Sequence, residues 1–282
     1  MRNPTGKFDV TWLPRRRGVS QADPFGLVKD DRIFILCEQL DSNGKGKIVC
    51  YEEARDHSFS ECYAALELPY HVSYPYLVES EGQIYCVPET NQAHEIALYR
   101  ASEFPRSWEK TATLIEDFRG VDPTLFKFND KWWLACANED DEPWRKLYLW
   151  HSEELTGPWE PHNANPVKTA LASSRPAGTP FIFEGDLYRP AQDCSGSYGR
   201  RVVINRVKRL TTEQFQEEES ATLDPLSPLY ANGFHTLSSV GQSTLIDGRR
   251  LRMVSSFREA RRNWAGQRRS LRRRLNYTDE KR

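Results

Sequence analysis

The chain has 282 residues, of which 38% are hydrophobic and 28% charged, so it can bury a core and is not disordered by composition. Its 33 aromatic side chains (8 Trp, 12 Tyr and 13 Phe, against 2 Met) favour strands, and the lack of a long apolar run or apolar N-terminal segment predicts a cytoplasmic protein without a membrane span. The net charge of −1 conceals an asymmetry, because residues 249–282 carry +10 and leave −11 for residues 1–248.

A layout of about fifty residues repeats along the chain. Each copy has a short apolar strand, a tight turn and a second, aromatic-rich strand, and the copies span residues 23–38, 74–89, 122–137 and 177–192. The turns occur at the same offset in every copy, at Asp31, Gly82, Asp130 and Gly185. A fifth, weaker copy begins near Gly233.

Two more strand-like segments follow each hairpin, for example in residues 45–53 and 94–110. Four strands per copy and five copies predict an all-β fold, a five-bladed β-propeller of four-stranded antiparallel blades around a central channel. Its predicted extent is residues 1–257, with blades that start near residues 23, 74, 122, 177 and 233. A β-sandwich is the alternative, although a sandwich does not require a fifty-residue period.

The two ends of the chain carry further predictions. The segment FDVTWL (residues 8–13) could pair with the fifth blade and close the ring, which would protect its edge. Residues 258–282 are predicted to form a basic C-terminal helix or tail. Such a tail could contact phosphate nonselectively, but we expect a solvated segment and no nucleic-acid partner.

The six cysteines show no spacing typical of a zinc site. Three of them, Cys37, Cys86 and Cys136, lie inside apolar strand-like runs. We therefore expect buried free thiols and a reducing compartment.

The repeat predicts which side chains meet at one mouth of the channel, because the inner strand of every blade begins there. These positions are Asp23, Tyr74, Asp122, Ala177 and Gly233. The neighbouring candidates are His71, Arg175 and His235, and the ends of the second strands add Glu38, Glu89, Gln192 and Asp193. Carboxylates that crowd in a cleft raise one another's pKa, which suits acid and base chemistry.

Two families resemble this chain at these residues. ADPFGL (22–27), VDPTLF (121–126) and TGPW (156–159) resemble the five-bladed glycosidases of glycoside hydrolase family 43. HVSYPY (71–76), RPAQD (189–193), SYG (197–199) and GFHT (233–236) resemble the N-terminal propeller domain of glucosamine inositolphosphorylceramide transferases. The second resemblance is closer and runs from about residue 22 to residue 248.

The resemblance to family 43 implies roles for three carboxyl groups. Asp23 matches the general base of blade one, and Asp122 matches the aspartate that orients it and tunes its pKa. The general-acid glutamate of blade four would fall at Ala177 and Gly178, so it is absent here. We rank Glu89 first as its substitute, followed by the other candidates at the mouth, His235 and Asp193. The same resemblance implies a calcium ion near a histidine of blade five, for which His235 is the only match; the residues themselves predict no cofactor.

The remaining candidates are expected to bind the substrate glycan: His71, Tyr74, Arg175, Arg189, Gln192, Asp193, His235 and Glu38. The arginines could bind a carboxylate or phosphate on a sugar, and the aromatic rings of Tyr74, Tyr76, Trp144 and Tyr198 could stack on sugar faces.

Each polar candidate also has a structural alternative. An aspartate before proline often caps a turn, the glutamates could pair with one of the two arginines, and the histidines could be buried structural residues. The sequence therefore supports two functions. One is a glycoside hydrolase-like enzyme with Asp23 as general base. The other is a non-catalytic glycan-binding propeller that serves a glycosyltransferase or formyltransferase partner.

Overall fold

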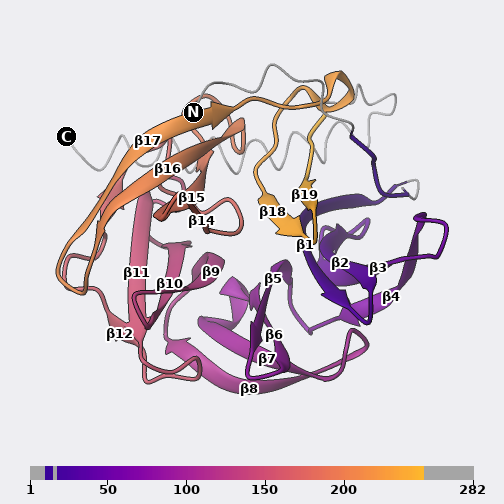
Figure 1. The fold of residues 1–282 in the computed structure, drawn as a ribbon, viewed down its shortest axis with the longest axis horizontal. Coiled ribbons are helices and arrows are strands. Elements are labelled where there is room, and N and C mark those ends of the chain that lie inside the picture. The colour runs from indigo at the N-terminus through magenta and orange to yellow at the C-terminus, as the bar shows by residue number, and fades with distance from the viewer. Residues whose placement is uncertain (1–9, 15–17, 251–282) are drawn as a thin grey trace. The chain divides into compact units, whose positions relative to one another are not determined.

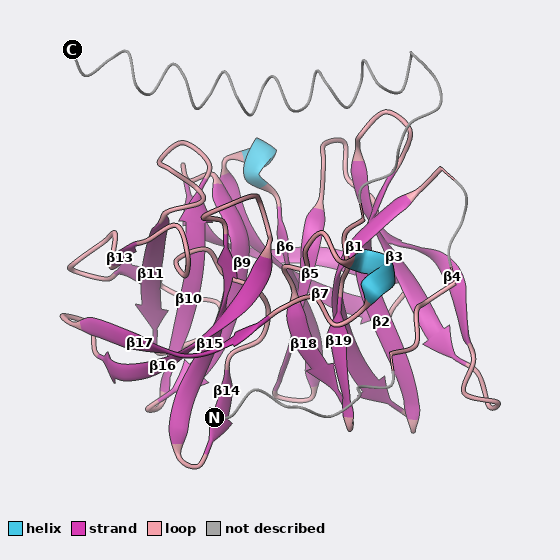
Figure 2. Cartoon of the chain, turned by 90° about the horizontal axis from the view of Figure 1, so that it is seen from above, coloured by secondary structure: helices cyan, strands magenta, loops and turns pink. Residues whose placement is uncertain are grey.

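Four antiparallel sheets follow one another around a ring in chain order, and a hairpin fills the space between the last sheet and the first (Figure 1). This computed structural model describes residues 10–14 and 18–250. Strands make up most of the described chain, and its helices are two short 3-10 turns, η1 (Asn91–Ala93) and η2 (Pro228–Tyr230) (Figure 2). The predicted boundary at residue 257 and the predicted tail lie outside the described residues.

Each sheet is one blade, and its first strand lies nearest the centre of the ring (Figure 1). The first blade contains β1 (Ser20–Lys29), β2 (Arg32–Leu40), β3 (Gly46–Glu53) and β4 (Phe59–Leu66). The second contains β5 (Ser73–Ser80), β6 (Gln83–Glu89), β7 (Glu95–Glu103) and β8 (Ser107–Glu116). The third contains β9 (Gly120–Phe128), β10 (Lys131–Asn138), β11 (Lys146–Ser152), β12 (Glu160–Pro161) and β13 (Lys168–Thr169). The fourth contains β14 (Phe181–Phe183), β15 (Asp186–Asp193), β16 (Arg201–Leu210) and β17 (Phe215–Leu223).

Within the described ranges, the fifth position of the ring holds a hairpin, β18 (Leu237–Val240) and β19 (Ser243–Ile246). The hairpin joins both neighbours: the N–H of Leu237 donates to Ala177 O of blade four, and the hydroxyl of Ser238 donates to Pro24 O of blade one. The prediction of an all-β propeller is thus confirmed. Of the five predicted four-stranded blades, three have four strands, the third has five because two short strands pair with β11, and the fifth has two strands among the described residues.

The inner hairpins have the turns that the sequence predicts. The predicted turn residues Asp31, Gly82, Asp130 and Gly185 all have positive φ. The residue before each of them does too, which is the type I′ geometry that matches the right-handed twist of paired strands.

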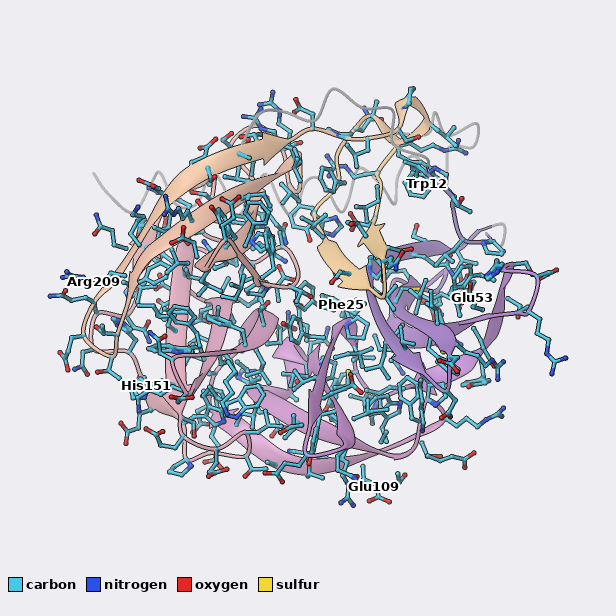
Figure 3. The ribbon with its side chains drawn as sticks, viewed as in Figure 1. Trp12, Phe25, Glu53, Glu109, His151 and Arg209 are labelled. Carbon is cyan, nitrogen blue, oxygen red and sulfur yellow. The ribbon has the colours of Figure 1, made fainter. Side chains whose placement is uncertain are left out.

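The apolar core lies between the blades, since each sheet packs its faces on its neighbours. A cluster around Leu98, Leu125 and Leu134 joins blades two and three, and one around Trp133 and Leu187 joins blades three and four. Phe25 lies near the centre of the ring, whereas Glu53, Glu109, His151 and Arg209 lie toward its rim (Figure 3). The ring is therefore held by burial between its sheets.

The N-terminal segment packs on the ring in a way that differs from the prediction. Residues 10–14 form no strand, and residues 8 and 9 lie outside the described part of the chain. Leu13 packs against the cluster of Ile35 and Tyr51, and the Trp12 ring lies 4.1 Å from that of Tyr230. The segment thus contacts the first blade and the loop before the hairpin through side chains.

Five cysteines, Cys37, Cys50, Cys86, Cys136 and Cys194, are buried and form no disulfide. The expectation of buried free thiols is confirmed for these five. In the described ranges, no helix is long and apolar enough to cross a membrane.

Candidate functional site

A β-bulge places the first residue of the site in each of the first three blades. Asp23, Tyr74 and Asp122 each precede a proline, each sits where the ladder shifts register, and each has a φ between 46° and 54°. A left-handed residue before proline is strained by about 1–3 kcal/mol, so packing and hydrogen bonds must hold it. The bulge turns these side chains away from the direction that strand alternation alone would give.

Asp122 is the centre of a buried polar network. Its Oδ2 accepts from Arg175 Nε at 2.6 Å and from Gln192 Nε2 at 2.8 Å. Its backbone N–H donates to Glu89 Oε2 at 3.1 Å, while the other oxygen of Glu89 accepts from Asn91 Nδ2 at 2.8 Å. The structure thus brings together predicted residues from blades two, three and four, with Arg175 as the counter-ion of Asp122.

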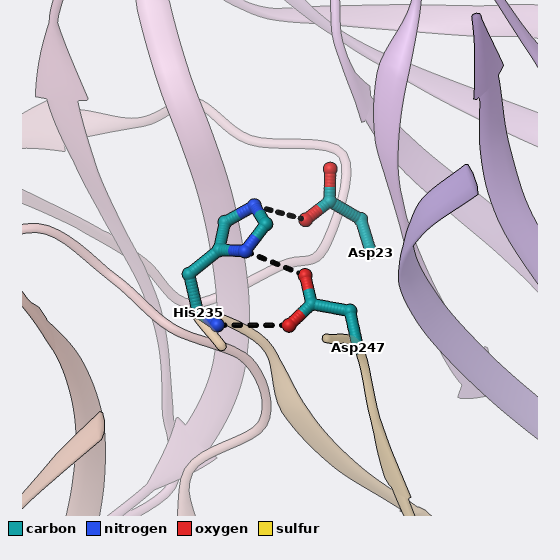
Figure 4. Close-up of side chains that lie close together, drawn as sticks. All are labelled: Asp23, His235 and Asp247. Atoms are coloured by element: carbon teal, nitrogen blue, oxygen red, sulfur yellow. Dashed lines mark hydrogen bonds and ion pairs between the residues drawn. The ribbon is translucent and has the colours of Figure 1, made fainter. Parts of the chain in front are cut away.

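Asp23 belongs to a second polar network, whose other members, His235 and Asp247, flank the hairpin in sequence (Figure 4). Its Oδ1 accepts from Thr236 Oγ1 at 2.7 Å and lies 3.5 Å from His235 Nε2. The other nitrogen of the imidazole, His235 Nδ1, lies 2.6 Å from Asp247 Oδ2. Asp247 Oδ1 accepts from the backbone N–H of His235. Asp23 Oδ2 accepts no hydrogen bond from the described residues, and the Asp23 side chain keeps 8% of its surface exposed. That oxygen is the one available to a ligand.

Glu38 and His71 form a third contact. The backbone N–H of Gly46 donates to His71 Nδ1 at 2.9 Å, so in the neutral ring the proton is on Nε2. Nε2 lies 3.3 Å from Glu38 Oε1. A Cβ at Gly46 would come within 2.7 Å of His71 Cε1 and 2.9 Å of Glu38 Oε1, so this close approach requires glycine.

Burial and crowding shift the pKa values of the acidic groups upward. Burial raises the pKa of Asp23 to about 6 although His235 opposes it, and burial together with Asp122 raises that of Glu89 to about 8. Burial, then Asp23 and Glu89, raise the pKa of Glu38 well above its ordinary value. The pKa of each of these carboxyls is thus raised by at least one neighbouring carboxyl group, so they form one electrostatic cluster.

The histidines shift in opposite directions. Burial alone would lower the pKa of His235, but the ion pairs with Asp247 and Asp23 outweigh it and raise the pKa to about 9. Burial lowers the pKa of His71. At neutral pH, His235 is therefore an imidazolium and His71 a neutral imidazole.

Tyr74 lies at the centre of the ring and is fully buried, so it offers no face to a sugar. Its hydroxyl accepts from Gly178 N–H at 2.7 Å and lies 2.9 Å from Thr124 Oγ1, which links blades two, three and four. Tyr76 is buried in the same core. The expectation that these two rings stack on substrate is wrong, because the bulge turns Tyr74 into the core.

Two other aromatic rings lie beside the polar cluster. The guanidinium of Arg175 lies 5.0 Å from the centre of the Tyr198 ring, and Tyr198 makes an edge contact with His235 at 5.2 Å. The ring of Trp144 lies 6.2 Å from that of Tyr198. Both rings are partly exposed, so they remain candidates for stacking on a sugar.

Two predicted site residues lie apart from this cluster. Arg189 binds Glu217 through two hydrogen bonds of 2.6 and 2.9 Å, because it faces the side of β15 opposite to Gln192. Asp193 accepts from Arg201 Nε and from Ser195, and these contacts lower its pKa although burial opposes them. Neither contacts the other predicted site residues, so a role for them in substrate binding has no support in the geometry.

The sequence did not single out Asp247, Thr236 or Asn91. Asp247 belongs to the weak fifth copy of the repeat, in STLIDG, and its position directly after an apolar strand end could have marked it. Thr236 follows His235 directly, and Asn91 follows Glu89 by two residues. The roles of Thr236 and Asp247 depend on where the propeller closes, which no local pattern gives, whereas the contact of Asn91 with Glu89 is local.

One donor from each of Asp23, His235 and Asp247 lies within 4.8 Å of the others, a grouping that could hold a metal ion. Both nitrogens of His235, however, face carboxylates, and its raised pKa makes it a cation. The imidazolium supplies the positive charge that a metal would bring, so the residues fit an ion-paired histidine better than a calcium ligand set.

Two solved structures of glycosidases share this fold. A family 117 glycoside hydrolase of Zobellia galactanivorans matches with a TM-score of 0.56 and 14% identity, over 73% of this chain and 70% of that chain. A family 43 β-1,3-galactosidase matches with a TM-score of 0.59 and 12% identity, over 72% of this chain and 47% of that one. At such identities the likeness shows the class of fold alone, a β-propeller.

The family follows from sequence. The model of the N-terminal domain of glucosamine inositolphosphorylceramide transferase 1 matches residues 18–225, so the chain belongs to that family. The transferase of that name from Oryza sativa subsp. japonica is 37% identical over 203 residues, which cover 70% of this chain. The one from Arabidopsis thaliana is 30% identical over 205 residues. The chain spans 27% of the length of either relative.

Proposed function

We propose that the cluster around Asp23 and Asp122 hydrolyses a glycosidic bond in a glycan or glycoconjugate. The observation that carries this proposal is the free Oδ2 of Asp23, on a carboxyl whose pKa is about 6 and whose other oxygen is fixed by Thr236. A general base works best with a pKa close to the operating pH. Asp23 would be largely ionised at pH 7 and still basic enough to take a proton from water.

The chemistry divides among the residues as follows. Asp23 Oδ2 accepts a proton from a water molecule as that water attacks the anomeric carbon, and the bond to the leaving oxygen breaks. Asp122, whose Oδ2 is held by Arg175 and Gln192, raises the pKa of Asp23. Trp144 and Tyr198 offer ring faces to the sugar.

The relatives' names suggest the first substrates to test. They are named as transferases of glucosamine and inositolphosphorylceramide, so glucosaminides and glycosylated inositol phosphates head a panel that also includes galactosides and xylosides. In that panel, Asp23→Asn should lower kcat/KM at least about 100-fold, because general-base catalysis supplies factors of that size. Proton NMR of the first product should show an inverted anomer.

The matched control is Asp193→Asn, which changes a buried aspartate of blade four that is held by Arg201 outside the cluster. It should keep kcat/KM within about threefold of the wild type, since it contacts no group assigned to the reaction. An Asp23→Asn variant with the wild-type rate on every cleaved substrate would disprove the proposal.

A second candidate is a glycan-binding propeller that serves a glycosyltransferase or formyltransferase partner. Two observations favour it. The blade-four acid is missing at Ala177 and Gly178, and this chain spans 27% of the length of relatives that are named as transferases. Saturable glycan binding, kept by Asp23→Asn, without turnover of any glycan in the panel would select this function.

A further inference from the structure

The blade-four position where family 43 glycosidases have their acid cannot hold one in this chain. Gly178 has a φ of 111°, and a Cβ there would lie 1.9 Å from Leu237 O. Its N–H is bound to the Tyr74 hydroxyl, and the preceding Ala177 is fully buried. Hydrolysis as proposed above therefore needs a proton donor from another blade.

Most ionisable groups of the cluster are already committed. Both oxygens of Glu89 accept N–H bonds, from Asp122 and from Asn91. Both nitrogens of His235 face carboxylates. Asp193, the other predicted substitute, lies outside the cluster and is paired with Arg201. Each of these groups is held by partners from the protein, so none has a free atom to offer to a leaving oxygen.

Glu38 differs from them in having one free oxygen. It occupies the same place in blade one that Glu89 has in blade two, since Glu38 pairs with Ala22, the neighbour of Asp23, and Glu89 pairs with Ser73. Its Oε1 faces the N–H of His71, whereas its Oε2 has no hydrogen-bond partner among the described residues. The Glu38 side chain keeps 10% of its surface exposed.

The contact with His71 also determines where a proton on Glu38 would sit. Gly46 N–H occupies His71 Nδ1, so His71 Nε2 carries the hydrogen and directs it at Oε1. An acidic proton of Glu38 is then best placed on the other oxygen, because a proton on Oε1 would oppose the one on Nε2. His71 and Gly46 are thus positioning residues for a carboxylic acid.

We infer that Glu38, through Oε2, is the proton donor to the leaving oxygen in the proposed hydrolysis, with His71 as the residue that positions it. The inference rests on the proposed function. As the glycosidic C–O bond breaks, the Oε2 proton passes to the leaving oxygen, and the proton of the attacking water passes to Asp23. Exchange with solvent then returns a proton to Glu38 and removes one from Asp23, so the net reaction consumes one water.

The kinetic test compares Glu38→Gln with Glu89→Gln on aryl glycosides of one sugar whose phenols are poor or good leaving groups. Loss of a general acid matters most for a poor leaving group. Glu38→Gln should lower kcat/KM about 100-fold or more for the poorest phenol, lose less than about tenfold for 2,4-dinitrophenol, and lose the basic limb of the pH profile. His71→Leu should move that limb to higher pH, because it removes a donor that favours the carboxylate.

A stability test needs no substrate. Because the pKa of Glu38 is raised in the folded protein, the wild type should match Glu38→Gln in Tm near pH 4.5 and fall below it as the pH rises. Glutamine mimics the neutral acid and still accepts from His71, so the variant should fold.

The outcomes separate the two ideas. A Glu38→Gln variant without leaving-group dependence, or a dependence found in Glu89→Gln instead, overturns the assignment of Glu38 while hydrolysis stands. If the wild type cleaves nothing in the panel, the proposed hydrolysis fails and the donor role with it, and the Tm comparison still shows whether Glu38 is held as an acid. Parallel Tm curves for wild type and Glu38→Gln from pH 4.5 to pH 9 would also overturn the inference.

Discussion

Replacing Arg175 with methionine tests the charge balance of the site. The guanidinium is 9% exposed and the carboxylate of Asp122 is 4% exposed, so the variant leaves a buried charge whose remaining side-chain donor is Gln192. Removing one partner of a buried ion pair costs about 3–5 kcal/mol. For a domain of this size, each kcal/mol corresponds to about 2–4 °C in Tm, so we expect a loss of roughly 10 °C at pH 8.

The assay is thermal and urea unfolding of wild type and Arg175→Met at pH 8. The control is Arg100→Met, which breaks an exposed pair with Glu109 at 3.7 Å and should cost less than about 1 kcal/mol. A loss for Arg175→Met no larger than for the control would refute this account of the network.

Three further predictions use other contacts. Gly178→Glu, which restores an acid where family 43 has one, should destabilise the fold by more than about 3 kcal/mol in urea unfolding, since its Cβ meets Leu237 O; a normally stable variant would contradict this. Asp247→Asn should lower the Tm most near pH 6, and the difference should shrink as the pH rises through about 9, because His235 stabilises the fold while protonated; a pH-independent difference would count against the pair. Millimolar calcium should change the Tm at pH 7 by less than about 1 °C, since a protonated His235 offers no lone pair; a clear rise would indicate a calcium site.

The inner hairpins could be predicted because their information is local. A strand, a left-handed turn residue and a second strand recur at a fixed offset, and that period places Asp23 and Asp122 at equivalent points of blades one and three. The structure brings both into one buried cluster with Glu38 and Glu89. Residues that share a place in the repeat share a place in the ring.

The predictions that failed concern the direction of individual side chains and the closure of the propeller, which the repeat period does not determine. Tyr74 occupies the same position of the repeat as Asp23. The bulge turns its large side chain inward, where it packs against Phe25 and is part of the core. Arg189 is close to Gln192 in sequence, yet strand alternation sends it to Glu217 between blades. The two-stranded fifth unit and the strandless residues 10–14 show that ring closure depends on side-chain contacts far apart in the chain.

The hydrogen bond between Thr236 and Asp23 joins residues 213 positions apart. Bringing such distant groups together carries a high entropic cost during folding, so this contact should be among the last to form. Asp23 and His235 therefore meet only in a finished ring. A nascent chain, or a fragment cut before the hairpin, would contain Asp23 without the residues that orient it. An assembled site would therefore show that the hairpin has been synthesised and that the propeller has closed.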